Sequence, residues 1–160
     1  AATRTPALDV AMNRLSRAAD YSKISLAASL VLATTRGRSG RRAALSGLAA
    51  AGVTATVLNL GLKRVGRVRP DPLASRVPVA RRVRVPRSTS FPSGHAGAAF
   101  AFAAGVGQVL PRAAIPLRAI AALIAYSRVH TGVHYPADVV AGALVGSVFG
   151  RLTAKASPGS

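Results

Sequence analysis

The sequence predicts an all-α fold: an integral membrane helical bundle of about five transmembrane helices, preceded by an amphipathic N-terminal helix. Hydrophobic residues make up 50% of the 160-residue chain and charged residues only 16%, which is unusual for a soluble protein of this size. Apolar segments alternate with arginine-rich connections, and no run alternates between apolar and polar residues over the length of a strand. We therefore expect one membrane-embedded domain over residues 1–157 and a disordered tail at 158–160.

The first element, residues 1–22, is predicted to be an amphipathic helix. Leu8, Met12 and Leu15 recur at spacings of three and four residues, and arginines occupy other positions around the helix. This pattern is typical of a helix that lies on the surface of a protein or of a membrane. We expect the helix to be structural and to take no part in chemistry.

The clearest membrane span is the uncharged segment 43–62. Its twenty residues, at about 1.5 Å each, match a hydrocarbon layer roughly 30 Å thick. The other apolar segments are shorter or carry an arginine near one end: 24–35, 92–110, 113–127 and 139–150. If the helices cross in order, the connections 63–91 and 128–138 lie on the same face of the membrane. All three histidines then reach that face.

The basic residues of these connections favour an anionic ligand. The formal charge of the chain is +18, which by itself fits lipid headgroups, a phosphate-bearing substrate or nucleic acid. Arg69 and Arg128 can each hold phosphate oxygens with the planar guanidinium, and Lys63 adds a point charge. Three cations can thus meet a phosphate dianion and the charge of its transition state.

A helix N-terminus is expected beside these cations. Ser90 is a predicted N-cap and Pro92 a predicted first helical residue. The backbone N–H groups around Ser93 and Gly94 would then point out of the helix end, where anions bind.

The histidines supply the chemistry. Asp138 follows His134 at a spacing of four residues, and Pro136 is expected to begin the next helix. The carboxylate can hold the imidazole in one tautomer, leaving the other nitrogen free to attack phosphorus. His95 can protonate the leaving oxygen and later deprotonate the water that hydrolyses the phosphohistidine.

These residues closely resemble the signature of the type 2 phosphatidic acid phosphatase superfamily, which includes lipid phosphate phosphatases, bacterial acid phosphatases and vanadium haloperoxidases. Residues 92–95 match its Pro-Ser-Gly-His motif in full, and Ser127, Arg128, His134 and Asp138 match its third motif in spacing. The resemblance covers about residues 43–150. It implies His134 as nucleophile, Asp138 as its partner and His95 as general acid and base. It also implies the phosphate ligands Lys63, Arg69, Ser93, Gly94 and Arg128.

The first motif departs from the family pattern, which places six residues between a lysine and Arg-Pro. Here five residues separate Lys63 from Arg69, and Leu62 stands at the position of the family's lysine. The backbone shifts by one residue, or Lys63 reaches from its neighbouring position, or Arg64 or Arg67 takes over. The sequence leaves these alternatives open.

Together the residues and the resemblance predict a metal-independent, cofactor-free phosphatase that removes a terminal phosphate from a lipid. The candidate substrates are phosphatidic acid, phosphatidylglycerol phosphate, a polyprenyl diphosphate and a prenyl-linked sugar phosphate, and nothing in the sequence selects among them. Two other functions remain as alternatives: a vanadate-dependent haloperoxidase and a catalytically silent lipid-binding or lipid-flipping bundle. The four acidic residues are scattered, which argues against a metal-dependent phosphatase, and seven aromatic residues, largely in apolar segments, argue against nucleic-acid binding.

The expected surroundings are a bilayer with anionic lipids. An Ala- and Arg-rich composition with almost no Lys suggests a bacterial genome rich in GC, and hence the bacterial plasma membrane. Basic residues occur on both faces, and after those assigned to the substrate are discounted, the balance favours an extracytoplasmic active site. Homo-oligomer formation is left open.

Overall fold

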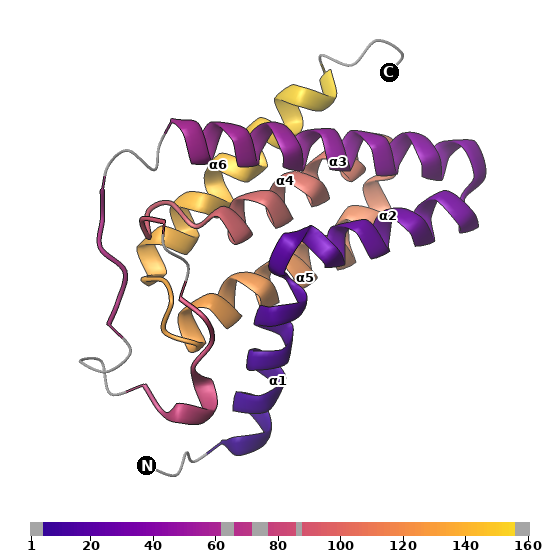
Figure 1. Ribbon diagram of the computed structural model, residues 1–160. Coiled ribbons are helices and arrows are strands. Elements are labelled where there is room, and N and C mark those ends of the chain that lie inside the picture. The colour runs from indigo at the N-terminus through magenta and orange to yellow at the C-terminus, as the bar shows by residue number, and fades with distance from the viewer. Residues whose placement is uncertain (1–4, 62–65, 72–76, 86–87, 156–160) are drawn as a thin grey trace.

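The computed structural model describes residues 5–61, 66–71, 77–85 and 88–155, and this part of the chain is helical with irregular connections and no strand. Figure 1 shows its helices in chain order. The α-helices are α1 (Pro6–Ala18), α2 (Lys23–Thr35), α3 (Gly37–Leu60), α4 (Gly94–Val109), α5 (Pro111–His130) and α6 (Pro136–Lys155). Two short 3-10 helices are η1 (Asp20–Ser22) and η3 (Val79–Arg81). The all-α prediction is confirmed.

Helix α4 forms the centre of the bundle, because it packs against α3, α5 and α6. Its residues are mostly alanine and glycine, and the stretch from Ala101 to Val106 is buried. Small side chains allow the neighbouring helices to approach α4 closely. Figure 1 shows α1 at an angle to the bundle, and α1 packs on α5 and η3.

The crossing of α4 and α6 depends on glycines of α6. A Cβ atom at Gly146 would lie 2.8 Å from the carbonyl carbon of Gly97 and would collide with the carbonyl oxygen. A Cβ atom at Gly142 would collide with the carbonyl oxygen of Ser93. At the same junction the Ser93 N–H donates to the Asp138 carbonyl oxygen at 2.8 Å. The close crossing therefore sets the first turn of α4 against the first turn of α6.

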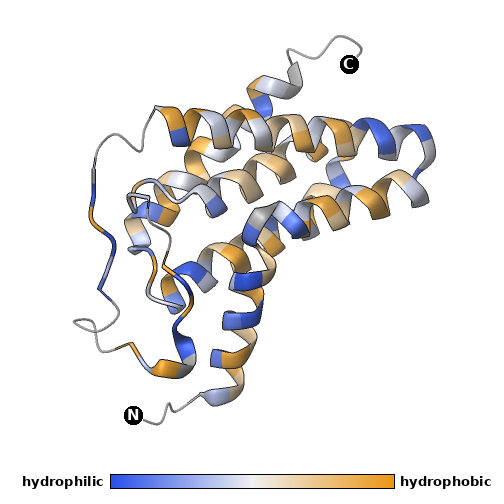
Figure 2. Cartoon of the chain, in the orientation of Figure 1, coloured by the Kyte–Doolittle hydropathy of each residue, from blue (hydrophilic) through white to orange (hydrophobic). Residues whose placement is uncertain are grey.

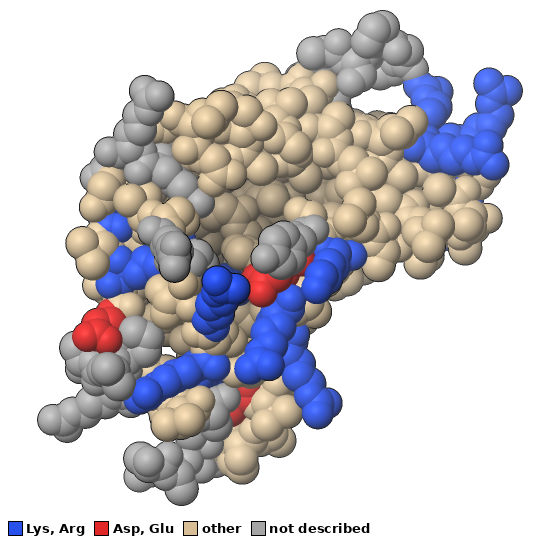
Figure 3. All heavy atoms as spheres, viewed as in Figure 1, with Lys and Arg blue, Asp and Glu red and all other residues tan. Residues whose placement is uncertain are grey.

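The exterior of the bundle is apolar, and Figure 2 shows hydrophobic residues along α2 to α6. Large side chains on it are largely exposed, among them Leu26, Leu30, Leu45, Ile115 and Leu144. Figure 3 shows Lys and Arg gathered at separate ends of the visible face, with an uncharged band between them. Such a band is typical of a protein surface that faces lipid.

Among the described helices, α3 is the one both long and apolar enough to cross a membrane by itself. Helix α2 is apolar but shorter. The expectation of about five spans goes beyond this finding and stays a prediction.

Two local predictions were wrong. Helix α4 begins at Gly94 with Ser93 as its N-cap, whereas we expected Ser90 and Pro92 in these roles. The reason is that Ser90 is bonded elsewhere: its N–H donates to the Arg67 carbonyl oxygen at 2.9 Å, and its hydroxyl lies 3.3 Å from the same oxygen.

The buried face of α1 also differs from the predicted apolar stripe. Its buried residues are Asp9, Met12 and Ser16, whereas Leu8 is exposed. The polar residues are buried because they bind side chains of α5 and of the segment around η3.

Candidate active site

The connection between α5 and α6 presents His134 and Asp138. Gly132, with φ of +72°, lets the chain turn after α5, and Pro136 begins α6 as predicted. His134 Nδ1 lies 3.5 Å from Asp138 Oδ2, which also accepts the Tyr135 N–H at 2.9 Å. Both side chains are buried. The carboxylate is thus fixed beside one ring nitrogen.

Arg69 lies at the other ring nitrogen. Its NH1 donates to the Val133 carbonyl oxygen at 2.9 Å and lies 3.0 Å from His134 Nε2. Its Nε donates to the Ser88 carbonyl oxygen at 2.8 Å, and its NH2 donates to that of Thr89 at 3.1 Å. Because a guanidinium can only donate, Nε2 accepts, and the ring proton belongs on Nδ1, facing Asp138. The connections 63–91 and 128–138 therefore meet at His134, as the sequence predicted.

Arg128, near the end of α5, is almost fully buried. Its NH1 donates to the Ser16 hydroxyl oxygen at 2.6 Å and lies 3.7 Å from Asp20 Oδ1. Its Nε is buried and has no hydrogen-bond partner within the described residues. A buried guanidinium nitrogen without a partner is expensive, so this N–H is a donor available to a bound anion.

These cations act on the protonation of the nucleophile candidate. Burial first, and then the charges of Arg69, Arg128 and His95, lower the pKa of His134 to about 3. The imidazole of His134 is therefore neutral near pH 7, and its Nε2 carries a lone pair that accepts from Arg69 in this structure.

His95 lies in the first turn of α4, where Ser93 caps the helix by accepting the Ala96 N–H at 3.5 Å. His95 Nε2 lies 3.0 Å from Asp20 Oδ1, the same oxygen that faces Arg128. His95 therefore shares a charge partner with one of the phosphate-ligand candidates.

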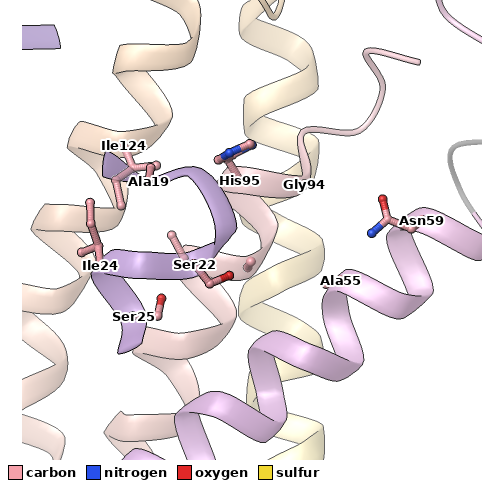
Figure 4. A pocket seen from close by; sticks show the side chains of 11 residues that line it. Ala19, Ser22, Ile24, Ser25, Ala55, Asn59, Gly94, His95 and Ile124 are labelled. Atoms are coloured by element: carbon pink, nitrogen blue, oxygen red, sulfur yellow. The ribbon is translucent and has the colours of Figure 1, made fainter. Parts of the chain in front are cut away.

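A cavity of about 200 Å³ opens beside His95. Figure 4 shows it between the turn that precedes α2, the face of α3 and the start of α4. The lining is mostly small, with Ala19, Ser22, Ala55, Gly94 and Asn59 around the histidine.

The first motif is only partly described. Lys63 and Arg64 lie outside the described residues. Arg67 NH1 lies 3.1 Å from Asp138 Oδ1, and its guanidinium stacks over the Tyr135 ring at 4.5 Å from the centroid. The structure thus places Arg67 against the carboxylate partner of His134.

Sequence reasoning missed two residues here, Ser16 and Asp20. Neither belongs to a motif, and the only signal was that Asp20 is one of four acidic residues in the chain. We also expected the Ser93 N–H to bind an anion, whereas in the structure it donates to the Asp138 carbonyl oxygen.

Two solved structures of membrane phosphatases share the fold of this chain. LpxE of Aquifex aeolicus matches with a TM-score of 0.73 at 29% identity, over 96% of this chain and 88% of that chain. The first transmembrane PAP2 type phosphatidylglycerolphosphate phosphatase, from Bacillus subtilis, matches with a TM-score of 0.68 at 28% identity, over 94% and 76%.

Relatives found by sequence are also named as phosphatases of lipids. A lipid A 1-phosphatase of Rhizobium etli is 37% identical over 101 residues, 60% of this chain and 42% of that protein. A decaprenylphosphoryl-5-phosphoribose phosphatase of Mycobacterium tuberculosis is 37% identical over 92 residues, 55% and 46%. The chain thus spans less than half the length of these two relatives. The family model described as the PAP2 superfamily matches residues 42–159, which include His95, His134 and the rest of the motifs. This chain belongs to the PAP2 superfamily.

Proposed function

We propose that the protein is a membrane lipid phosphate phosphatase that works through a phosphohistidine at His134. The observation that carries the proposal is the arrangement of its imidazole: Nδ1 faces Asp138 at 3.5 Å, and Nε2 faces Arg69 NH1 at 3.0 Å. A phosphate that takes the Arg69 N–H from His134 comes to Nε2 and leaves the lone pair of this nitrogen free to attack phosphorus.

The phosphate ligands come from three elements. Arg69 offers NH1, Arg128 offers its unpartnered Nε, and the first turn of α4 offers the Gly94 N–H. The Ser93 oxygen accepts from Ala96, but its hydroxyl hydrogen can still donate to a phosphate oxygen. Lys63 completes the set in this proposal, with Arg64 as the alternative. The fixed contact of Arg67 with Asp138 makes it the weaker substitute.

The reaction has two steps. His134 Nε2 forms a bond to phosphorus as the bond from phosphorus to the lipid oxygen breaks, and protonated His95 gives its proton to that oxygen. Neutral His95 then takes a proton from water, whose oxygen attacks phosphorus and releases inorganic phosphate and His134. The cations stabilise the charge on the phosphoryl oxygens in both steps.

No step in this scheme needs a metal ion or another cofactor. Within the described residues, no three His, Cys, Asp or Glu side chains are placed to hold a metal ion. Two arginines and a helix end supply the positive charge that a metal supplies elsewhere.

A lipid substrate fits the apolar exterior and the cavity beside His95, which is open between helices. The relatives named for lipid A and for a decaprenyl-linked phosphoribose support this class. The candidates are phosphatidic acid, phosphatidylglycerol phosphate, a polyprenyl diphosphate and a prenyl-linked sugar phosphate. We place the protein in the bacterial plasma membrane as a bundle of about five spans, of which α3 is the one supported by its own length and apolarity, with the site on the extracytoplasmic face.

The test is phosphate release from a panel of these lipids by the purified protein in detergent. Release from at least one lipid, lost in His134→Ala, is the expected result. No release from any lipid supports the silent lipid-binding bundle, and halide oxidation in the presence of vanadate without phosphate release supports a haloperoxidase.

The orientation in the membrane is tested separately, by labelling Arg36→Cys and Ser88→Cys from outside intact cells. Labelling at position 88 alone is expected, and labelling at position 36 alone reverses the assignment.

A further inference from the structure

We propose that Asp20 is a positioning residue for His95, so that η1 completes the active site from outside the three motifs. This inference rests on the proposed function, in which His95 is the general acid and base. The contact that carries it joins His95 Nε2 to Asp20 Oδ1 at 3.0 Å. An imidazole N–H that donates to a carboxylate is held in one orientation.

The position of Asp20 is fixed by the anchoring of α1. Buried Asp9 meets His130 Nε2 and Arg81 Nε, each at 2.8 Å, which ties α1 to the end of α5 and to η3. Asn13 donates to the Arg82 carbonyl oxygen at 3.0 Å. Next to Asp20, Ala19 is buried. We expected residues 1–22 to be structural and to take no part in chemistry, and the contact of Asp20 with His95 is the reason that this proposal departs from that expectation.

The need for a carboxylate here is electrostatic. The chain has four acidic residues against 22 Lys and Arg, and two of the four lie beside the two motif histidines. Arg128 from α5 faces the same Asp20 oxygen, and His134 lies close enough for its pKa to respond to the charge of His95. Arg69 adds a further positive charge next to His134, 3.0 Å from its Nε2. These cations oppose a protonated imidazole, whereas a general acid has to carry a proton.

Asp20 thus separates the two histidines in function. Burial and then the cations keep His134 neutral for attack, and the Asp20 carboxylate holds an N–H of His95, the imidazole that has to donate a proton. The two histidines differ because His134 is buried and faces Arg69, whereas His95 faces the Asp20 carboxylate.

The experiment compares Asp20→Asn, Asp20→Glu and wild type in phosphate release from the lipid that the wild type hydrolyses, measured as kcat/KM against pH. Asp71→Asn is the matched control, since it removes the same charge from an exposed position of the connection 63–91. We expect kcat/KM of Asp20→Asn to be roughly 10- to 100-fold lower at neutral pH. We also expect the basic limb of its profile of kcat/KM against pH to move about one pH unit lower. In Asp20→Glu the basic limb should return to its wild-type position, and in Asp71→Asn it should not move.

An aryl phosphate, whose leaving group needs no proton, is the second substrate. The ratio of aryl to lipid hydrolysis does not depend on the folded fraction, and it should rise in Asp20→Asn. An unchanged ratio and an unchanged pH limb overturn the inference, as does a faster Asp20→Asn enzyme, which would make Asp20 a competitor of the substrate phosphate. Wild type without phosphatase activity overturns the proposed function as well, so the two failures are distinguishable.

Discussion

The close crossing of α4 and α6 can be tested with a single methyl group, in Gly146→Ala. The added Cβ would lie 2.8 Å from the Gly97 carbonyl carbon and 3.0 Å from its Cα, both main-chain atoms of α4. Carbon atoms in good contact are about 3.5–4.0 Å apart, so the helices have to separate by roughly 0.5–1 Å. Such overpacking costs about 1–3 kcal/mol, and the higher helix propensity of alanine returns about 0.5–1 kcal/mol.

The separation also moves the site, because His95 and Asp138 lie in the first turns of these two helices. A displacement on the order of 1 Å can lower the rate about 100-fold. The assays are thermal unfolding in detergent and kcat/KM for phosphate release. Gly52→Ala is the matched control: its Cβ meets no atom within 4 Å, so stability should be unchanged or higher. A Gly146→Ala protein as stable and as active as Gly52→Ala would refute the argument.

Three further results are expected. His95→Ala should reduce kcat/KM, which reports the first phosphoryl transfer, by ~10²–10⁴-fold for the lipid and less for an aryl phosphate, whereas equal losses in kcat/KM contradict the acid role. Vanadate should inhibit and chelators should have no effect, because arginines meet the transition state; activity restored by a divalent ion after chelation would speak against this. The pKa of His134 is lowered to about 3 in the folded protein, below about 6.5 when unfolded, so the unfolded state binds the extra proton between these values. Wild type should therefore lose stability from pH 6.5 towards pH 4 more steeply than His134→Asn, and parallel losses would show that His134 does not titrate in this way.

The helix order and the meeting of the motif connections could be predicted from the sequence, because apolar segments and the loops between them follow local composition. The third motif is a local feature: His134 and Asp138 are four residues apart across the start of α6 at Pro136, and this short separation brings their side chains together.

Contacts between distant segments could not be predicted in this way. The stripe of Leu8 and Met12 suggested an apolar face for α1, but burial follows the partners that α5 supplies to Asp9 and Ser16. A buried Asp is acceptable only when paired, and its partner His130 lies 121 residues away in the chain. Asp20 escaped notice for the same reason.

The start of α4 shows a second limit of prediction from the sequence. Both Ser90 and Ser93 are suitable N-caps by residue type, and the sequence does not say which is used elsewhere. In the fold, Ser90 bonds the main chain of Arg67, which leaves Ser93 to cap the helix.

The covalent intermediate on His134 can be trapped. His95→Ala protein is mixed with an aryl phosphate, quenched in alkali, where phosphohistidine survives, and mapped by peptide mass spectrometry. The leaving group departs without a proton, but the water step lacks its base, so phosphate should accumulate on His134. The account predicts one phosphorylated site, His134, absent when His134→Ala is added; turnover in that double variant, or phosphate on any other residue, would contradict it.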